Sequence, residues 1–159
     1  MSHRAVVITV SDRAAAGTRA DASGPVAVEA LRQAGFTCAD AVVVPDGADS
    51  VEAALREALA ARPLLVLTSG GTGIAPSDRT PEGTARVLER AVPGIAEELR
   101  RIGAAAAPGG LLSRGLAGVA GGALIVNLPG SPGGVADGIE VVLRVADHVA
   151  SQLGGGDHR

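Results

Sequence analysis

Large aromatic side chains are almost absent from this chain of 159 residues, which contains one Phe and neither Tyr nor Trp. Hydrophobic residues still make up 47% of the chain, enough to build one sizeable core. Because rings cannot supply the buried area, small and branched side chains have to pack closely. We therefore predict a single domain over residues 1–153, followed by a flexible C-terminal tail over residues 154–159.

Lysine is also missing, since all 14 basic side chains are arginine. This absence excludes Schiff-base catalysis and the phosphate-binding lysine of a Walker loop. The formal net charge is −3, and no run of basic residues occurs along the chain. A nucleic acid or an anionic membrane surface is therefore not an expected partner.

Cysteine and histidine are too scarce for several kinds of site. Cys38 is the only cysteine, so an intramolecular disulfide cannot form, and we expect a buried structural thiol. His3, His148 and His158 are too scattered for a histidine-based triad or a zinc site.

Long hydrophobic runs are lacking as well. The apolar segment 5–10 is too short for a signal peptide. The uncharged stretch 115–136 is interrupted by glycines and two prolines, which favours strand, loop and helix start over a membrane span. The sequence predicts a cytoplasmic protein that does not cross a membrane.

Short runs of branched apolar residues alternate with segments of helical periodicity. Strands are predicted over residues 4–10, 36–44 and 64–68, and a hairpin over residues 116–127 turning at Gly121 and Gly122. Helices are predicted over residues 24–34, 50–61, from 80 onward, 93–102 and 135–153. This order indicates a three-layer α/β/α fold with a mostly parallel sheet and a late antiparallel hairpin.

The predicted helix ends carry capping signals. Asp49 or Ser50, and later Thr80, offer side-chain oxygens to the first free amides of two helices. Pro25 is placed at the first position of its helix, and Gly103 at the end of another.

Polar and glycine-rich clusters follow the predicted strands, at the carboxyl ends where open α/β sheets bind ligands. The segment Ser69-Gly-Gly-Thr-Gly73 offers backbone amides and two hydroxyls, which suit phosphate oxygens. It matches neither the Walker pattern nor the Rossmann fingerprint, because Pro76 stands where a third glycine would be needed. A plain tight turn is the alternative.

Two acidic residues accompany the segment Ser69–Gly73, which we call the cradle. Asp78 lies shortly after Gly73, and Asp46 follows the preceding strand, near the cradle if the two strands are neighbours in the sheet. Carboxylates next to phosphates repel unless a hard cation lies between them, and Mg²⁺ takes oxygen ligands of both kinds. We interpret Asp46 and Asp78 as organisers of Mg²⁺ and phosphate; ordinary turn and cap chemistry is the alternative.

A second glycine-rich loop, residues 128–134, precedes the closing helix. The first amides and the positive end of the helix dipole favour an anion there. Two cradles suggest two phosphate-bearing ligands, although a simple loop before a helix would look similar. Arg13, Arg79 and Arg114 lie in predicted loops near strand ends, where they can bind phosphate or remain solvated.

Several of these segments, in this order, are similar to those of the MogA/MoaB family of molybdenum cofactor biosynthesis, from Arg4 to about Leu153. The motifs that carry the resemblance are Val10-Ser-Asp-Arg13, Gly17, Asp21, Gly24, Pro45-Asp46, Thr68-Ser-Gly-Gly-Thr-Gly73, Asp78 with Thr80-Pro81, Pro93-Gly94, Leu112-Ser-Arg114 and Asn127-Leu-Pro-Gly130.

This resemblance implies a molybdopterin adenylyltransferase, which transfers AMP from MgATP to the terminal phosphate of molybdopterin and releases pyrophosphate. It implies that Asp46 and Asp78 act in catalysis with Mg²⁺, with ATP as co-substrate. The residues expected to bind the substrates are Ser11, Asp12, Arg13, Ser69, Gly70, Gly71, Thr72, Gly73, Ser113, Arg114, Asn127, Pro129, Gly130 and Ser131. A homotrimer, and hand-over of the product to a molybdenum-insertion protein, are further expectations.

Two alternatives stay open at this point. The chain lacks the insertion that longer MogA-type members carry between the Leu-Pro-Gly loop and the last helix, and it shares this compact form with MoaB-type members. A catalytically silent protein that binds pterin or serves assembly is therefore one alternative, and an unrelated nucleotide hydrolase is another.

Overall fold

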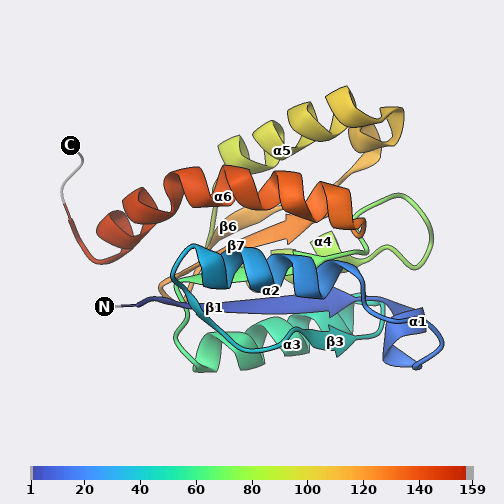
Figure 1. The fold of residues 1–159 in the computed structure, drawn as a ribbon, viewed down its shortest axis with the longest axis horizontal. Helices are drawn as coiled ribbons and strands as arrows, with labels where there is room; N and C mark the ends of the chain where they lie inside the picture. The colour runs from blue at the N-terminus through green and yellow to red at the C-terminus, as the bar shows by residue number, and fades with distance from the viewer. Residues whose placement is uncertain (1, 157–159) are drawn as a thin grey trace.

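The computed structural model describes residues 2–156 and contains one mixed sheet between two layers of helices (Figure 1). The strands are β1 Arg4–Val10, β2 Thr37–Cys38, β3 Val42–Val44, β4 Leu65–Ser69, β5 Arg90–Ala91, β6 Ala117–Ala120 and β7 Ala123–Leu128. The helices are α1 Asp12–Ala15, α2 Ser23–Gln33, α3 Ala48–Ala60, α4 Thr80–Ala85, α5 Pro93–Ala106 and α6 Pro132–Leu153, with a 3₁₀ helix η1 over Pro108–Leu112.

The strand order is β2-β1-β4-β7-β6-β5, and β3 also pairs with β1. Strands β1, β2, β3, β4 and β7 run parallel, whereas β6 is antiparallel to both β7 and β5. Gly121 and Gly122 turn the chain between β6 and β7 with φ of 56° and 76°, as a two-residue hairpin turn requires. The predicted parallel sheet and late hairpin are confirmed.

Each face of the sheet packs against its own helices. Side chains from α2, α5 and α6 share one core cluster with alternate residues of β1, β4 and β7, and α3 contributes to a second cluster on the other face. The register explains the alternation: Leu65 and Leu67 belong to the first cluster and Val66 to the second. In Figure 1, α2 and α6 lie side by side in front of the sheet.

Several predicted boundaries were wrong. The strand predicted over 36–44 is two short strands, which pair with different parts of β1. Asp49 and Ser50 lie inside α3, whose N-cap is Gly47, and Thr80 is the first residue of α4 rather than its cap. Pro25 is the third residue of α2, which begins at Ser23.

The helix after Pro93 continues past Gly103 to Ala106, contrary to the prediction. Gly103 is covered by η1, because a side chain on Gly110 would collide with the Gly103 backbone. The C-cap of α5 is Ala107, whose amide donates to Gly103 O at 3.0 Å. Helix α1, the 3₁₀ helix η1 and the two-residue strand β5 were missed, since none is long enough to show a periodic pattern. Arg13, predicted in a loop, therefore lies in α1.

The predicted tail falls partly outside the described residues, which end at Gly156. The amides of Gly154, Gly155 and Gly156 donate to carbonyls of the last turn of α6. The flexible tail over residues 154–159 stays a prediction. Cys38 is buried as expected, and among residues 2–156 no helix has the length and apolarity to cross a membrane.

Candidate functional site

The carboxyl ends of four parallel strands open at one end of the molecule, at the right of Figure 1, while the start of β1 and the end of α6 lie at the left. The register places Thr9 beside Ser69, Ser69 beside Leu128, and Val10 beside Val44. The loops that leave β1, β3, β4 and β7 therefore start next to one another. The polar segments 11–13, 45–47, 69–78 and 127–134 therefore meet here.

The sequence places Asp46 near the cradle if the strands before Asp46 and before the cradle are neighbours in the sheet. These strands, β3 and β4, are not neighbours. Strand β1 lies between them because the crossover through α3 passes over it. Asp46 nevertheless reaches the cradle: a side chain on Gly71 would begin 3.3 Å from Asp46 Oδ1. Asp46 and Gly71 are therefore close in space although their strands are not adjacent.

The cradle after β4 depends on two glycines with positive φ, Gly70 at 98° and Gly71 at 68°. Thr80 fixes both peptides: its hydroxyl donates to Gly70 O at 2.9 Å and its amide donates to Gly71 O at 3.1 Å. None of the described residues accepts a hydrogen bond from the amides of Gly71, Thr72 or Gly73. Three consecutive amides are therefore available to an anion.

Asp46 is joined to Asp12, the first residue of α1. The amide of Asp12 donates to Asp46 Oδ2 at 3.1 Å, and the amide of Asp46 donates to Asp12 Oδ1 at 2.9 Å. Burial raises the pKa of Asp46, and the charges of Asp12 and Asp78 raise it further against the hydrogen bond from the Asp12 amide. This carboxylate is half-buried and has two acidic neighbours.

Asp78 ends the short loop that follows the cradle. Its Oδ2 accepts a hydrogen bond from the amide of Ala75 at 3.0 Å. A side chain on Gly73 would begin 2.8 Å from the same oxygen, so the glycine lets the carboxylate approach the cradle closely. Asp46 and Asp78 accordingly flank Gly71 and Gly73.

The second loop meets the first. A side chain on Gly130 would begin 3.3 Å from Gly70 Cα, and Ser131 caps α6 by accepting from the Gly134 amide at 3.1 Å. A hollow of about 430 Å³ lies between this loop, the cradle and the α5–η1 segment, and its lining includes Thr72, Gly73, Ser113, Pro129 and Ser131. Five of the predicted binding residues thus border one cavity.

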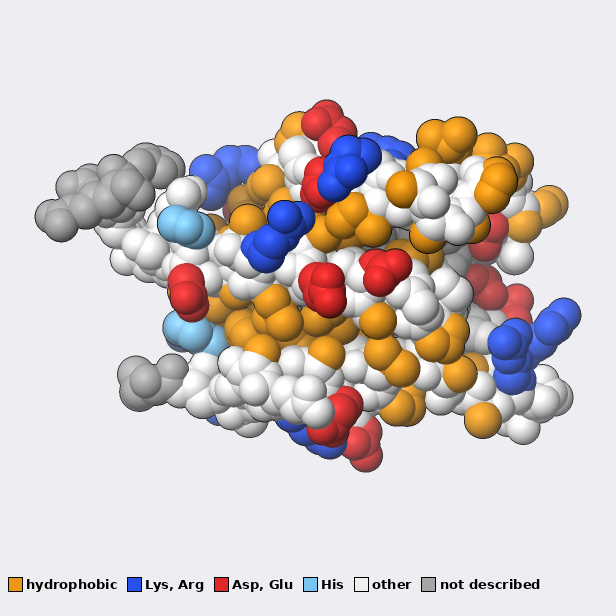
Figure 2. All heavy atoms as spheres, turned by 45° about the horizontal axis from the view of Figure 1, so that its top comes forward, with side chains coloured by type: hydrophobic (Ala, Val, Ile, Leu, Met, Phe, Trp, Pro, Cys, Tyr) orange, Lys and Arg blue, Asp and Glu red, His pale blue; other side chains and the backbone are white. Residues whose placement is uncertain are grey.

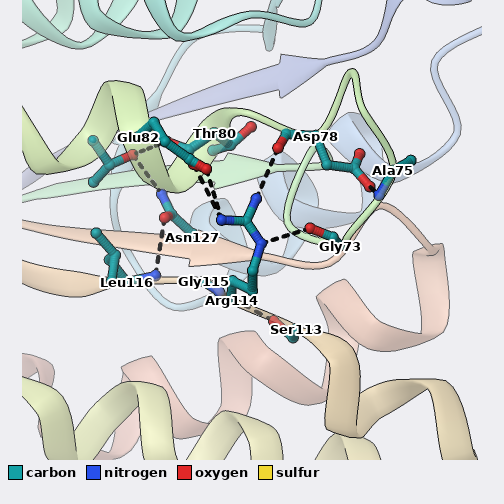
Figure 3. A network of polar contacts seen from close by, with 11 residues as sticks. Gly73, Ala75, Asp78, Thr80, Glu82, Ser113, Arg114, Gly115, Leu116 and Asn127 are labelled. Atoms are coloured by element: carbon teal, nitrogen blue, oxygen red, sulfur yellow. Dashed lines mark hydrogen bonds and ion pairs between the residues drawn. The ribbon is translucent and has the colours of Figure 1, made fainter.

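Two residues predicted to bind substrate have side chains that form several hydrogen bonds within the protein. Asn127 is 3% exposed; its amide donates to the hydroxyls of Thr68 and Thr84, and its Oδ1 accepts from the Leu116 amide. Arg114 donates to Glu82 and to two backbone carbonyls (Figure 3). Both side chains are held by neighbouring protein groups, and the assignment of Asn127 and Arg114 as substrate contacts stays a prediction.

The other predicted binding residues differ in the exposure of their side chains. Ser11 caps α1 by accepting from the Ala14 amide at 3.2 Å, whereas the side chains of Asp12 and Arg13 are exposed on α1. The hydroxyl of Ser69 is buried against that of Ser23 at 2.7 Å. Arg13 is therefore free to move towards a ligand, and the Ser69 hydroxyl is not.

Asp21, one of the motif residues shared with the family, joins the end of β1 to the start of α2. Its carboxylate accepts from the hydroxyl of Thr9 at 2.8 Å and from the amide of Gly24 at 3.0 Å, beside the buried Ser23. The short spacing of Asp21, Ser23 and Gly24 is a capping pattern that could have revealed this role.

Apolar side chains gather next to the site, at the upper right of Figure 2, over the end of α5 and η1. Leu111 and Leu112 of η1 are 71% and 51% exposed, and Ile74 in the loop after the cradle is 67% exposed. The site therefore combines backbone amides that have no acceptor among the described residues with an apolar rim.

Comparison with known proteins shows the family of the chain. Residues 6–148 match the model of a probable molybdopterin binding domain. The Mog protein of molybdopterin biosynthesis from Mycobacterium ulcerans is 48% identical, with a TM-score of 0.90 over 96% of this chain and 99% of that one. The chain belongs to the MogA/MoaB family of molybdenum cofactor biosynthesis proteins.

Members from both branches of the family resemble the chain. The molybdopterin biosynthesis enzyme MoaB of Thermus thermophilus is 42% identical, with a TM-score of 0.88 over 99% of both chains. The molybdopterin adenylyltransferase of Escherichia coli K12 is 36% identical over 139 residues, 86% of this chain and 71% of the relative. The chain spans about half the length of the bifunctional cofactor-biosynthesis proteins that it also matches.

Proposed function

We propose that the protein is a molybdopterin adenylyltransferase, which joins the AMP part of ATP to the terminal phosphate of molybdopterin. The observation that carries the proposal is the convergence of Asp46 and Asp78 on a cradle whose Gly71, Thr72 and Gly73 amides face no acceptor among the described residues. Acidic side chains beside an anion cradle fit a metal-assisted reaction of phosphates better than simple anion binding.

The residues present fit Mg²⁺. Asp46 carries a carboxylate whose pKa is raised by burial and by the negative charges of Asp12 and Asp78, so a nearby cation would relieve an unfavourable arrangement. Among residues 2–156 no group of three or more acidic, cysteine or histidine side chains could hold a metal by itself. Mg²⁺ commonly takes one or two carboxylates together with substrate phosphates, which is the donor set available here.

The chemistry requires little beyond alignment. A phosphate oxygen of molybdopterin forms a bond to the α-phosphorus of ATP, while the bond to the bridging oxygen breaks and pyrophosphate leaves. The phosphate is already anionic near neutral pH, so no protein base is needed. When bound, Mg²⁺ neutralises charge on the reacting phosphates.

The chain's own residues bring the two anions together and keep them in line. The amides of Gly71 to Gly73 and the first turn of α6 supply hydrogen-bond donors and positive dipole charge on adjacent sides of the site. Alignment of this kind accounts for roughly 7–11 kcal/mol of barrier reduction in general. Hand-over of the adenylated product to a molybdenum-insertion protein is part of the same proposal.

The test is to incubate the purified protein with molybdopterin, ATP and MgCl₂ and to follow adenylated pterin and pyrophosphate. Formation of both in equal amounts supports the proposal. Tight pterin binding without product would favour the second candidate, a silent MoaB-type binding protein. One observation favours that candidate: α6 begins at Pro132, inside the segment 128–134 that was predicted as a loop, so no insertion separates Asn127-Leu-Pro-Gly130 from the last helix.

A further inference from the structure

We infer that Arg114 is a positioning residue whose guanidinium fixes the loop carrying Asp78 and thereby holds that carboxylate at the cradle. Its catalytic consequence rests on the proposed function, whereas its structural consequence can be measured without any substrate.

The loop between the cradle and Asp78 has little support of its own. Residues 74–77 are all exposed. Within the loop, the Asp78 amide donates to Ala75 O at 2.9 Å, and the Ala75 amide donates to Asp78 Oδ2 at 3.0 Å. The carboxylate is therefore held by the backbone of the loop, and its position is only as well defined as the position of that loop.

Arg114 fastens both ends of this loop. Its Nε donates to Gly73 O at 2.8 Å where the loop begins, and its Nη2 donates to Asp78 O at 2.7 Å where the loop ends (Figure 3). Its own amide donates to Thr72 O at 2.8 Å, which ties Arg114 to the cradle. A planar guanidinium can span two carbonyls in fixed directions, which an ammonium group cannot do.

Glu82 of α4 completes the arrangement by pairing with the remaining edge of the guanidinium. Arg114 Nη1 lies 2.6 Å from Glu82 Oε1 and 3.2 Å from Oε2. Among the described residues, the Asp78 carboxylate forms no ion pair with an arginine. Glu82 thus balances the charge of Arg114 and leaves the charge of Asp78 for a cation.

The variants Arg114→Gln, Arg114→Lys and Glu82→Gln test this role, with Arg101→Gln as the matched control. Arg101 forms an ion pair of equal length, 2.6 Å, with Glu98 on the exposed surface of α5 and does not line the hollow of the site. Hydrogen exchange of the intact protein is measured without ligands. We expect exchange at the Ala75 and Asp78 amides to accelerate at least about tenfold in Arg114→Gln, less in the other two variants, and not in the control.

The rate of adenylation should depend on how firmly Arg114 holds the loop. Adenylation by Arg114→Gln should fall about 10- to 100-fold and need more Mg²⁺ for half-maximal rate, while molybdopterin affinity changes less than about twofold. Unchanged exchange in the loop overturns the inference. So does a loss of molybdopterin affinity in Arg114→Gln with no effect of Glu82→Gln, since that result would make Arg114 a substrate contact.

The two proposals fail in different ways. If the parent protein makes no adenylated pterin, the proposed function fails, while the exchange measurement still decides the role of Arg114. If Arg114→Gln does not fold, the milder Arg114→Lys and Glu82→Gln variants give the same exchange comparison.

Discussion

Asp12 and Asp46 hold each other through a reciprocal pair of hydrogen bonds, in which each amide donates to the other carboxylate, at 3.1 Å and 2.9 Å. The two residues are 34 positions apart and follow different strands. The pair locks the ends of β1 and β3 together and at the same time brings two negative side chains side by side. Unfavourable charge is thus built into the place where the proposed cation acts.

The first prediction concerns the two acidic residues of the proposed reaction. Asp46→Asn and Asp78→Asn should each lower adenylation by two or more powers of ten, on the order of 3 kcal/mol in barrier, because each removes a charge that organises Mg²⁺ and phosphate. Molybdopterin affinity should stay unchanged or improve, since a repulsive charge is gone. Single-turnover assays beside binding titrations measure both effects.

Asp40→Asn is the control for that experiment, since the Asp40 side chain is 97% exposed and its ion pair is with Arg32, away from the site. It should behave like the parent protein. Near-normal turnover by Asp46→Asn and Asp78→Asn would reassign both aspartates to turn chemistry.

The second prediction concerns the cradle glycines. Gly71→Ala introduces a side chain at φ of 68° and against the Thr80 hydroxyl, and Gly73→Ala pushes on Asp78 Oδ2 from 2.8 Å. ATP and molybdopterin should both bind at least about tenfold more weakly, roughly 1.4 kcal/mol, while the fold is retained. Gly94→Ala is the control, because its added carbon meets nothing within 4 Å. If both cradle variants bind ATP and molybdopterin as tightly as the parent, the cradle is only a turn and does not bind phosphate.

The third prediction links the charge of Asp46 to stability. Because folding raises the pKa of Asp46, its ionised form destabilises the native state at neutral pH, and this penalty disappears as pH falls below the ordinary aspartate pKa of about 3.9. Asp46→Asn should therefore be more stable than the parent at pH 7, by less than about 1 kcal/mol or about 2–4 °C in Tm, and equal to it near pH 3. Thermal unfolding across pH measures this difference. A less stable variant at pH 7 would show that the Asp12 amide depends on a charged acceptor.

The fourth prediction follows from the hydrogen bonds of the buried Asn127 side chain. Asn127→Ala leaves the Leu116 amide and the hydroxyls of Thr68 and Thr84 without their partner, at a cost of about 2–4 kcal/mol. Denaturant unfolding measures the loss, and Gln152→Ala on the exposed side of α6 should cost little. If Asn127→Ala kept full stability but bound molybdopterin weakly, its original assignment as a substrate contact would stand.

The fifth prediction is a homotrimer, which we infer from the family. Much of the segment from Gly103 to Gly122 consists of small or apolar residues, and Leu111 and Leu112 are largely exposed in the single chain. Such residues are better covered in an assembly. Light scattering at micromolar concentration should give three times the chain mass, and a monomeric mass would contradict the prediction.

The sequence by itself determined the class of the fold and the place of the site. Branched apolar runs specified β1, β4 and β7, the spacing from Val135 to Leu153 specified α6, and the glycine-rich clusters marked the carboxyl ends of the strands. These features are local, since each depends on residues that are close in the chain, so their patterns can be read without tertiary structure.

Only the tertiary structure decided which polar groups bond within the protein and which have no partner there. Asn127 and Arg114 have side chains that suit phosphate, yet their donors bond to groups of β4, α4 and the loop after β4. Asp46 reached Gly71 although β1 separates their strands. Hydrogen-bond partners and charge neighbours depend on how distant segments pack, and that packing is not encoded in any one motif.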